Sequence, residues 1–223
     1  MHAIQKRRLP RAGGALSNEP GTGVERVSLL ANLLLNAIVF AALTFGGGLA
    51  TAWYMIEAGS RLSTRSFGPW MTWTTAGRPE ADPYTRAHVF RNGLLPLSTT
   101  LELTFRSKTD SRGARLSSDC DYTLLIEDMA AAWWNLAVFD GQGRLIPNPA
   151  ERYAFSSTSA APEADGRTAV TVARDARPGN WLPSGRASRI VLVFTVQDAA
   201  MAAAVHDNGP PPSMPEIKRV SCR

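Results

Sequence analysis

The chain has 223 residues, with 24 Lys and Arg against 19 Asp and Glu, a formal net charge of +5 and a pI near 9.7. The charge is unevenly placed, because residues 1–28 hold five cations and two anions whereas the other 195 residues hold 19 and 17. With 44% hydrophobic and 19% charged residues, the composition excludes a wholly disordered chain and a polybasic nucleic-acid binder, so no nucleic-acid partner is expected. Two Cys and 18 Gly exclude disulfide-dense and collagen-like chains.

The N-terminal part of the chain divides into a basic arm and an uncharged segment. Residues 1–26 are rich in Gly, Pro, Ser and Arg without apolar periodicity, which predicts a disordered arm. Residues 27–56 carry no formal charge. A bilayer core of about 30 Å needs roughly 20 apolar residues in a helix, so this segment predicts a transmembrane helix with the lipid bilayer as a partner. Trp53 and Tyr54 suit the far interface, where aromatic side chains gather.

Two other interpretations of residues 27–56 stay open. A cleaved signal peptide is one, because residues 50–52 read Ala-Thr-Ala, but the apolar core is about twice the usual 7 to 15 residues. A buried helix of a soluble protein is the other, less favoured because the uncharged segment is so long. Under the positive-inside rule, the five cations before the span place the arm in the cytoplasm and the large domain outside.

The two cysteines, Cys120 and Cys222, have no neighbouring His or Cys that would complete a metal site, so no metal is expected. In an oxidising compartment they are predicted to form a disulfide, since the topology exports the domain that carries both. Two unrelated buried thiols are the alternative.

The remainder of the chain indicates a mainly β domain. Residues 57–65 read as a connector, and Asp82-Pro83 reads as the start of a helix that ends at Gly93 or Pro96. Later segments are typical of strands and a hairpin turn: residues 101–105, 134–139 with a turn at 140–143, 169–173, 190–196 and the edge strand 217–220. The predicted fold is therefore an antiparallel β-sandwich or jelly roll over residues 66–223, preceded by one N-terminal transmembrane α-helix.

Six motifs in chain order resemble those of the DUF1214 family of domains of unknown function. They are Gly68-Pro69-Trp70, Asp82-Pro83-Tyr84-Thr85-Arg86-Ala87, Asp119-Cys120-Asp121-Tyr122, Trp133-Trp134, Ile146-Pro147-Asn148-Pro149 with Arg152-Tyr153, and Asn180-Trp181-Leu182-Pro183. The order and spacing are similar to small membrane-anchored members from Gram-negative bacteria. The resemblance implies a β-sandwich, a bacterial inner membrane with the domain in the periplasm, a companion protein of the DUF1254 type, and no established activity.

The chain departs from the family pattern on two strands. Members usually read Trp-Ser-Leu-Thr and then Tyr-Asp where this chain has residues 134–140, Trp-Asn-Leu-Ala-Val-Phe-Asp. The strand after the Asn-Trp-Leu-Pro motif usually carries an Arg and a Tyr, and residues 193–197 supply neither. If those groups form a polar site in relatives, part of that site is changed here.

Enzyme motifs are mostly absent, and no cofactor is expected. The sequence contains no G-x-S-x-G elbow, phosphate-binding Gly loop, H-E-x-x-H or C-x-x-C. Asp119 and Asp121, at alternate positions of a predicted strand, are the candidate acid/base residues of an envelope glycan hydrolase or lyase, although solvated carboxylates at a sheet edge are the commoner case. His88 is interpreted as a surface or satisfied helix residue rather than a general base.

A binding surface is the favoured functional hypothesis. Aromatic faces beside planar hydrogen-bonding groups often hold sugars and other polar rings, and the candidate ligand-binding residues are Asn148, Arg152, Tyr153, Asn180 and Trp181. The competing interpretation is structural, because Asn180 can stabilise a turn through its own backbone and Trp181 can cover a sheet edge. The sequence thus predicts a periplasmic domain that binds an envelope ligand, such as a glycan, or a partner protein.

Overall fold

The computed structural model describes residues 23–127, 133–207, 209–210 and 212–223. The predicted disordered arm lies almost entirely outside these residues. The chain divides into two compact units, Met1–Ala50 and Thr51–Arg223.

The N-terminal segment is helical, as the absence of charge predicts. It comprises α1 (Gly23–Ala41), one π-helical turn η1 (Ala42–Gly46) and α2 (Gly47–Ala58). Within the turn, the Thr44 hydroxyl donates to the carbonyl of Phe40 at 2.8 Å, one of the side-chain interactions that accompany local unwinding of a helix. Residues Val27–Ala58 form one helix that is long and apolar enough to cross a membrane.

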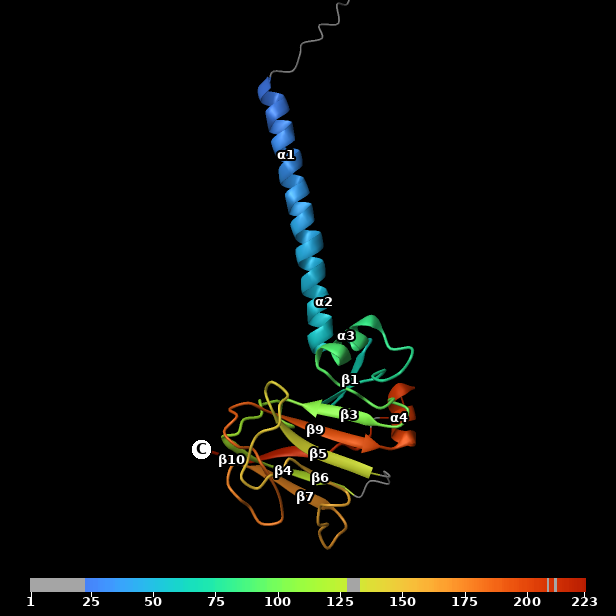
Figure 1. Ribbon diagram of the computed structural model, residues 1–223, viewed down its shortest axis with the longest axis vertical. Coiled ribbons are helices and arrows are strands. Elements are labelled where there is room, and N and C mark those ends of the chain that lie inside the picture. Colours follow the sequence, from blue (N-terminus) through green and yellow to red (C-terminus); the bar gives the residue numbers. More distant parts are fainter. Residues whose placement is uncertain (1–22, 128–132, 208, 211) are drawn as a thin grey trace, which may run out of the picture. The chain divides into compact units, whose positions relative to one another are not determined.

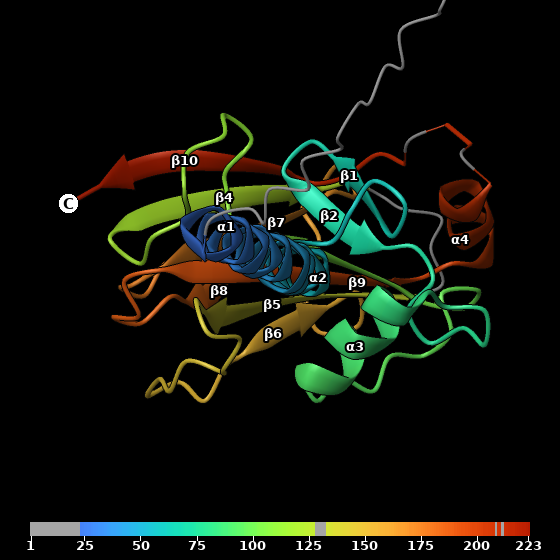
Figure 2. The ribbon, with the colours of Figure 1, turned by 90° about the horizontal axis from the view of Figure 1, so that it is seen from above.

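The second unit is mainly β and contains two sheets (Figure 1). The six-stranded sheet has the order β1 (Thr64–Phe67), β2 (Trp70–Trp73), β3 (Leu103–Ser107), β9 (Ile190–Gln197), β5 (Trp133–Asp140) and β6 (Ala154–Ser156). The four-stranded sheet has the order β10 (Glu216–Cys222), β4 (Cys120–Ile126), β7 (Thr168–Ala173) and β8 (Asn180–Pro183). The described residues of this unit also form two short helices, α3 (Pro83–Arg91) and α4 (Ala199–His206), and α4 lies at one end of the strands (Figures 1 and 2).

One hydrophobic core is shared by the two sheets. Phe105, Leu136 and Phe194 enter it from the six-stranded sheet, and Tyr122 and Leu182 enter it from the other sheet. On β3 the burial alternates, with Leu103, Phe105 and Ser107 buried and the intervening side chains half-buried. The period-two pattern therefore gives β3 an inner face in the core and an outer face that the core does not cover.

Two expectations are corrected by the strand pairing. The sheets are not wholly antiparallel, because β7 and β8 pair in parallel, with Val170 opposite Asn180 and Ala173 opposite Pro183. The six residues between these strands must return the chain along β7, and Gly179 supports that path with φ +77°. The strand predicted over residues 101–105 begins two residues later at Leu103, and Leu101 is 61% exposed.

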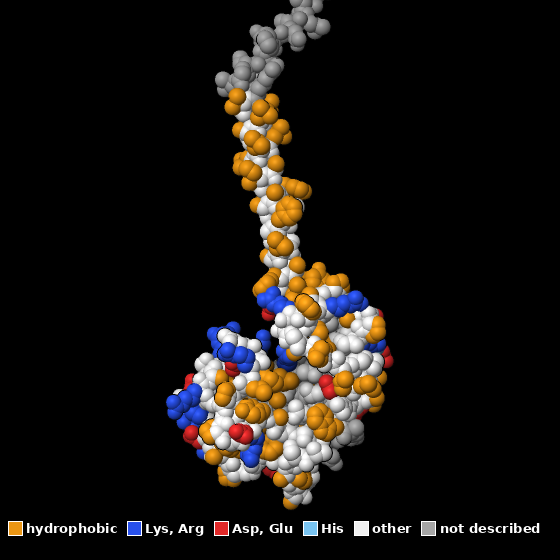
Figure 3. All heavy atoms as spheres, in the orientation of Figure 1, with side chains coloured by type: hydrophobic (Ala, Val, Ile, Leu, Met, Phe, Trp, Pro, Cys, Tyr) orange, Lys and Arg blue, Asp and Glu red, His pale blue; other side chains and the backbone are white. Residues whose placement is uncertain are grey.

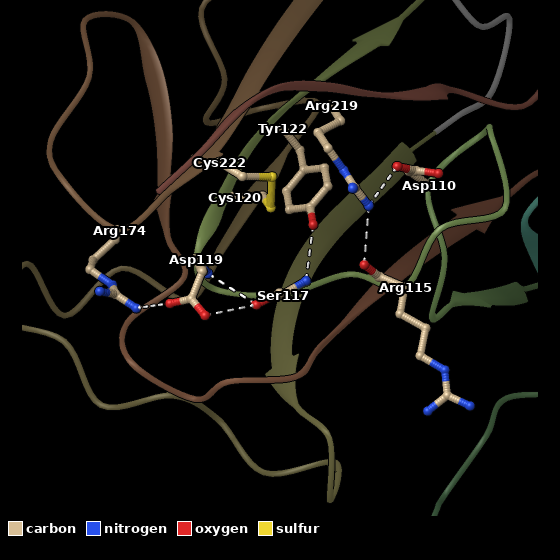
Figure 4. The surroundings of a disulfide bond; sticks show 9 residues. All are labelled: Asp110, Arg115, Ser117, Asp119, Cys120, Tyr122, Arg174, Arg219 and Cys222. Carbon is tan, nitrogen blue, oxygen red and sulfur yellow. Dashed lines mark hydrogen bonds and ion pairs between the residues drawn. A yellow bond between two sulfur atoms is a disulfide. The ribbon is translucent and has the colours of Figure 1, made fainter.

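Other predictions are confirmed. β10 is an edge strand beside β4, and Cys120 and Cys222, which lie opposite each other in that pair, form the predicted disulfide (Figure 4). Asp140 and Gly143 make the predicted turn after β5, with the Gly143 amide donating to the Asp140 carbonyl at 3.0 Å. β9 is the central strand between β3 and β5, as its continuous apolar sequence indicates.

Candidate functional site

A pocket of about 210 Å³ lies on the outer face of β2 and β3, below α3 and the segment that follows it. It combines an apolar wall with a few polar groups, which is typical of ligand pockets. Its lining residues are Met71, Thr72, Trp73, Ala76, His88, Val89, Leu94, Leu95, Pro96, Leu97, Thr99, Glu102, Thr104 and Arg106.

Helix α3, which covers the pocket, begins at the residues that the sequence predicts and ends at Arg91, two residues before the predicted Gly93. Asp82 is the N-cap, and its Oδ1 accepts hydrogen bonds from the amides of Tyr84 at 3.0 Å and Thr85 at 3.1 Å. Pro83 occupies the first helical position, where its missing N–H costs nothing. The buried face of α3 consists of Thr85 and His88, whereas Phe90 is 89% exposed.

His88 is held in the wall by two contacts. Its ring stacks on the indole of Trp73, with 4.2 Å between ring centroids, and its Nδ1 lies 2.8 Å from the carbonyl oxygen of Ile56. Because a carbonyl oxygen only accepts, Nδ1 carries the proton and Nε2 of the neutral ring is an acceptor. Burial lowers the pKa of His88, and the hydrogen bond to Ile56 opposes that shift. The histidine is 7% exposed, so of the two interpretations of the sequence, a surface residue or a satisfied helix residue, burial contradicts the first.

The two stacked rings both leave a buried nitrogen without a hydrogen-bond partner among the described residues: Nε1 of Trp73 and Nε2 of His88. Trp70, on the same strand as Trp73, shows the usual arrangement, because its Nε1 donates to the carbonyl of Pro215 at 2.8 Å. A buried polar atom without a partner costs about 1–3 kcal/mol, so two of them in one wall need an explanation.

Arg106 supplies the pocket's positive charge. It lies opposite Met71 on the outer face of β3, and within the described part of the chain its guanidinium forms no ion pair or hydrogen bond. Burial lowers the pKa of Arg106, which reflects the loss of water around the charged group. Glu102, the acid among the lining residues, instead accepts a hydrogen bond from the Gln197 amide at 3.2 Å. The arrangement is suited to an anionic group that would neutralise Arg106.

A second hollow of about 390 Å³ also has a basic lining, from Lys108, Arg115 and Arg189. It is larger, but the side chains of Arg115 and Arg189 are exposed, so water already solvates their charges. An exposed cation gains little from an ion pair, whereas a half-buried one such as Arg106 gains more. The pocket under α3 is therefore the better candidate.

The predicted ligand-binding residues lie around β8 and the preceding loops, and their hydrogen-bonding groups contact the chain itself. The Asn148 side chain bonds to the backbone of Arg152 in both directions, at 3.0 and 3.1 Å, and Arg152 Nη1 donates to the Trp181 carbonyl at 3.2 Å. Trp181 Nε1 donates to the Ala173 carbonyl at 3.0 Å. Arg152 also lies over the ring of Phe155, and the Tyr153 carbonyl accepts from the Val138 amide.

Asn180 is the most heavily used of this group. Its Oδ1 accepts from the Ala161 amide at 2.8 Å, and its Nδ2 donates to the carbonyls of Ala161 at 2.8 Å and Ala169 at 2.9 Å. The structure thus brings Arg152 and Trp181 together and ties Asn180 to a neighbouring loop. A ligand role for these residues stays a prediction.

The candidate acid/base residues, Asp119 and Asp121, each contact an arginine of the loop between β7 and β8. Arg174 lies 2.6 Å from Asp119 and Arg177 lies 2.5 Å from Asp121. The hydrogen bond and charge of Asp121 raise the pKa of Arg177. Figure 4 shows Asp119 beside the disulfide, with Arg174 reaching it from the loop. In the described chain both carboxylates therefore hold a loop in place.

Positions where the chain departs from the family pattern lie opposite one another in the six-stranded sheet. Asn135 pairs with Thr195 and Ala137 pairs with Val193. The changed groups thus share one region of β5 and β9, and a polar site there in relatives would be altered in this chain.

The sequence pattern does not identify Arg106 or Glu102 as site residues. Residues 102, 104 and 106 alternate with buried Leu103 and Phe105, which is also the pattern of any half-exposed strand. The signal that distinguishes Arg106 is the absence of a partner, and only the arrangement in space reveals it.

Comparison with known proteins confirms the resemblance. The family described as "Protein of unknown function (DUF1214)" matches residues 102–201, which include Arg106 and Glu102 but not Trp73 or His88. No curated protein matches the chain. The crystal structure of the VPA0106 protein from Vibrio parahaemolyticus is similar, with a TM-score of 0.55 and 17% identity over 79% of this chain and 43% of that one.

A putative uncharacterized protein from Burkholderia cenocepacia has a TM-score of 0.37 and 15% identity, over 55% of this chain and 30% of that one. The chain therefore spans less than half the length of either protein. The likeness to the Vibrio protein concerns the fold alone.

Proposed function

We propose that this protein, whose residues 102–201 match the DUF1214 family, is a single-pass bacterial inner-membrane protein whose periplasmic domain binds a ligand through an anionic group in the pocket beside Arg106. The basic residues before the apolar helix support a cytoplasmic N-terminus. The disulfide supports an oxidising compartment for the domain. The two sheets around one core support the β-sandwich or jelly-roll assignment.

The observation that carries the binding proposal is the half-buried Arg106, whose guanidinium lines the pocket without a hydrogen-bond or ion-pair partner among the described residues. A cation that is partly removed from water gains more from an anionic partner than a fully exposed cation does. A carboxylate or phosphate in the pocket would supply the missing partner with two charge-assisted hydrogen bonds, a geometry that suits the planar guanidinium. The unpartnered Nε2 of His88 adds an acceptor for a ligand hydroxyl or amine in the same wall.

Binding is favoured over catalysis by the placement of the acids. A glycan hydrolase or lyase needs two carboxyl groups facing one substrate. Asp119 and Asp121 are each neutralised by an arginine, and Glu102 stands as the acid among the pocket's lining residues. The companion protein of the DUF1254 type and an envelope glycan remain proposed partners, for which the surface around Asn180 and Trp181 is the predicted contact.

The test measures binding of dodecyl phosphate to the full-length protein in a neutral detergent by isothermal titration calorimetry, with dodecanol as the uncharged comparison. Arg106→Gln should weaken binding of dodecyl phosphate by about tenfold to a hundredfold, because a hydrogen bond to a charged group contributes about 1.5–3 kcal/mol. The matched control is Arg189→Gln in the second basic hollow, which should bind as the unmodified protein does.

Two results would contradict the proposal. One is equal binding of dodecyl phosphate and dodecanol, which would mean that the charge of Arg106 is not used. The other is loss of binding in Arg189→Gln with no loss in Arg106→Gln, which would assign the anion to the second hollow.

A further inference from the structure

The pocket adjoins the end of the apolar helix, within the unit Thr51–Arg223. Arg91 of α3 lies over the ring of Trp53, 3.8 Å from its centroid, and its Nε is 2.9 Å from Glu57. His88 of the same helix contacts the carbonyl of Ile56. Helix α3 is thus attached on one side to residues 53–57 and on the other to β2.

The surface of this region exposes large apolar side chains. Leu62 is 90% exposed, Phe90 is 89% exposed and Leu95 is 97% exposed. The guanidinium-bearing residues Arg61, Arg86 and Arg91 are also exposed on the same segments. Figure 3 shows hydrophobic and basic side chains together over the region of α3. A mixed surface of this kind is typical of segments that lie at a membrane interface, with apolar groups inserted and cations at the lipid phosphates.

The contacts of residues 53–57 with α3 place this surface beside the last turns of the apolar segment. Residues Val27–Ala58 make a helix of 32 residues. At about 1.5 Å per residue the helix is about 48 Å long, slightly more than the about 40–45 Å of a bilayer with its headgroups. Its last turns, which contact α3, would then emerge at the headgroup level, where Trp53 is a favourable interfacial residue.

The size and walls of the pocket indicate how much of a ligand it encloses. At about 210 Å³ it is smaller than the about 300–1,000 Å³ of pockets that enclose a drug-sized molecule. Leu94, Leu95 and Leu97 form one side of it, and Leu95 is also part of the exposed apolar surface. A ligand can therefore place its polar head beside Arg106 while its apolar part continues along these leucines and out of the pocket.

We infer that α3 and residues 93–97 rest on the membrane that the chain's own helix spans, and that the ligand of the pocket is an anionic phospholipid from that membrane, with its phosphate at Arg106 and an acyl chain along Leu94–Leu97. This inference rests on the proposed function and specifies its ligand class. A free phosphate compound has the same head chemistry, but it would leave the leucine wall uncovered.

The first experiment tests the lipid. Full-length protein in nanodiscs of phosphatidylcholine with phosphatidylglycerol is released for native mass spectrometry, and the retained lipid is identified. Phosphatidylglycerol should be retained over phosphatidylcholine, and Arg106→Gln should lower its retention roughly tenfold, the effect of one charge-assisted hydrogen bond. Arg189→Gln is the control and should retain it.

A parallel titration with glycerol phosphate and inorganic phosphate in detergent separates the two proposals. If these bind as well as the lipid does, and Arg106→Gln removes them, the pocket binds anions but the lipid inference is wrong. If neither lipid, alkyl phosphate nor free phosphate depends on Arg106, the proposed function itself is wrong.

The second experiment tests the membrane contact. Leu95→Cys and Leu145→Cys are each labelled with an environment-sensitive fluorophore in the nanodisc-embedded protein, and quenching by spin-labelled lipid is measured. Leu145 lies after the turn that follows β5 and is 50% exposed, so it reports a surface without the proposed contact. Strong quenching at position 95 with little at position 145 is expected, and equal quenching at both would overturn the membrane contact.

Discussion

The pocket under α3 and the surface around β8 have similar residue types but opposite hydrogen bonding. Around β8, Asn180 makes three hydrogen bonds to backbone groups and Trp181 makes one through its Nε1. In the pocket, Trp73 and His88 each leave a buried nitrogen unpaired, and Arg106 has no partner among the described residues. The comparison teaches that an Asn beside a Trp does not by itself identify a binding site, whereas unpaired polar groups in a cavity indicate where a ligand would add stability.

The largest effect on stability is expected at the four-stranded sheet. This sheet contains β8, whose polar side chains are hydrogen-bonded, and the disulfide between β4 and β10. Cys120→Ser with Cys222→Ser should lower the free energy of unfolding by up to about 4.7 kcal/mol, the chain-entropy value for a loop near 100 residues. Chemical denaturation of the full-length protein measures this loss. Pocket binding should survive in the folded fraction, so a variant that is fully stable yet no longer binds the alkyl phosphate would contradict the separation of the two regions.

Asn180→Ala should lower the free energy of unfolding by about 2 kcal/mol, because three hydrogen bonds of about 0.5–1.5 kcal/mol each are lost, with water restoring part of them. Denaturation midpoints at constant m-value report the change. A stability unchanged by this substitution would mean that Asn180 is free for a ligand after all.

Trp70 and Trp73 offer a matched pair on one strand. Trp70→Phe removes the hydrogen bond to Pro215 and should cost about 1–3 kcal/mol beyond the lost packing, since a buried carbonyl loses its donor. Trp73→Phe removes a donor that has no partner, so its cost should be that of packing alone. Thermal unfolding of both variants gives the difference, and equal costs would show that Trp73 Nε1 is satisfied in solution.

The smallest expected effect is a pH dependence from His88. Because burial lowers its folded pKa below the unfolded value of about 6.5, the unfolded chain binds the proton first. The stability contributed by neutral His88 is therefore complete above about pH 6.5 and is lost as the pH falls through the folded pKa. Nearby Arg106 and Lys108 act in the same direction as burial.

His88→Gln removes this titration, so its midpoint of denaturation should vary less with pH below 6.5 than that of the unmodified protein. Parallel pH profiles for the two proteins would show that His88 is not held neutral by its surroundings.

Much of the fold follows from local pattern, and the pocket does not. The cap at Asp82-Pro83, the turn after Asp140 and the continuous apolar strand from Ile190 depend on neighbouring residues, and each was predictable. The parallel pairing of β7 with β8 depends on the path of the six-residue loop between them. The residue types in that loop do not specify this path.

The pocket depends on distant segments in the same way. Trp73, His88 and Arg106 lie on three different elements. Arg106 has no partner because none of the described side chains around it comes within hydrogen-bonding distance, and this depends on the position of all of them. The alternation over residues 102–106 predicted that Arg106 faces outward, but nothing in that alternation distinguishes a solvated arginine from a desolvated one.

The central position of β9 also bears on how the chain folds as it is synthesised. Leu103 of β3 pairs with Val196 of β9, which is made 93 residues later. Until β9 is made, β3 lacks the strand that pairs with its second edge, and Leu103 and Phe105 lack the core residues that β9 contributes. Long-range pairing of this kind slows folding and exposes strand edges to other chains. If α3 rests on lipid during that interval, the bilayer would shelter the half-built sheet before the rest of the domain exists.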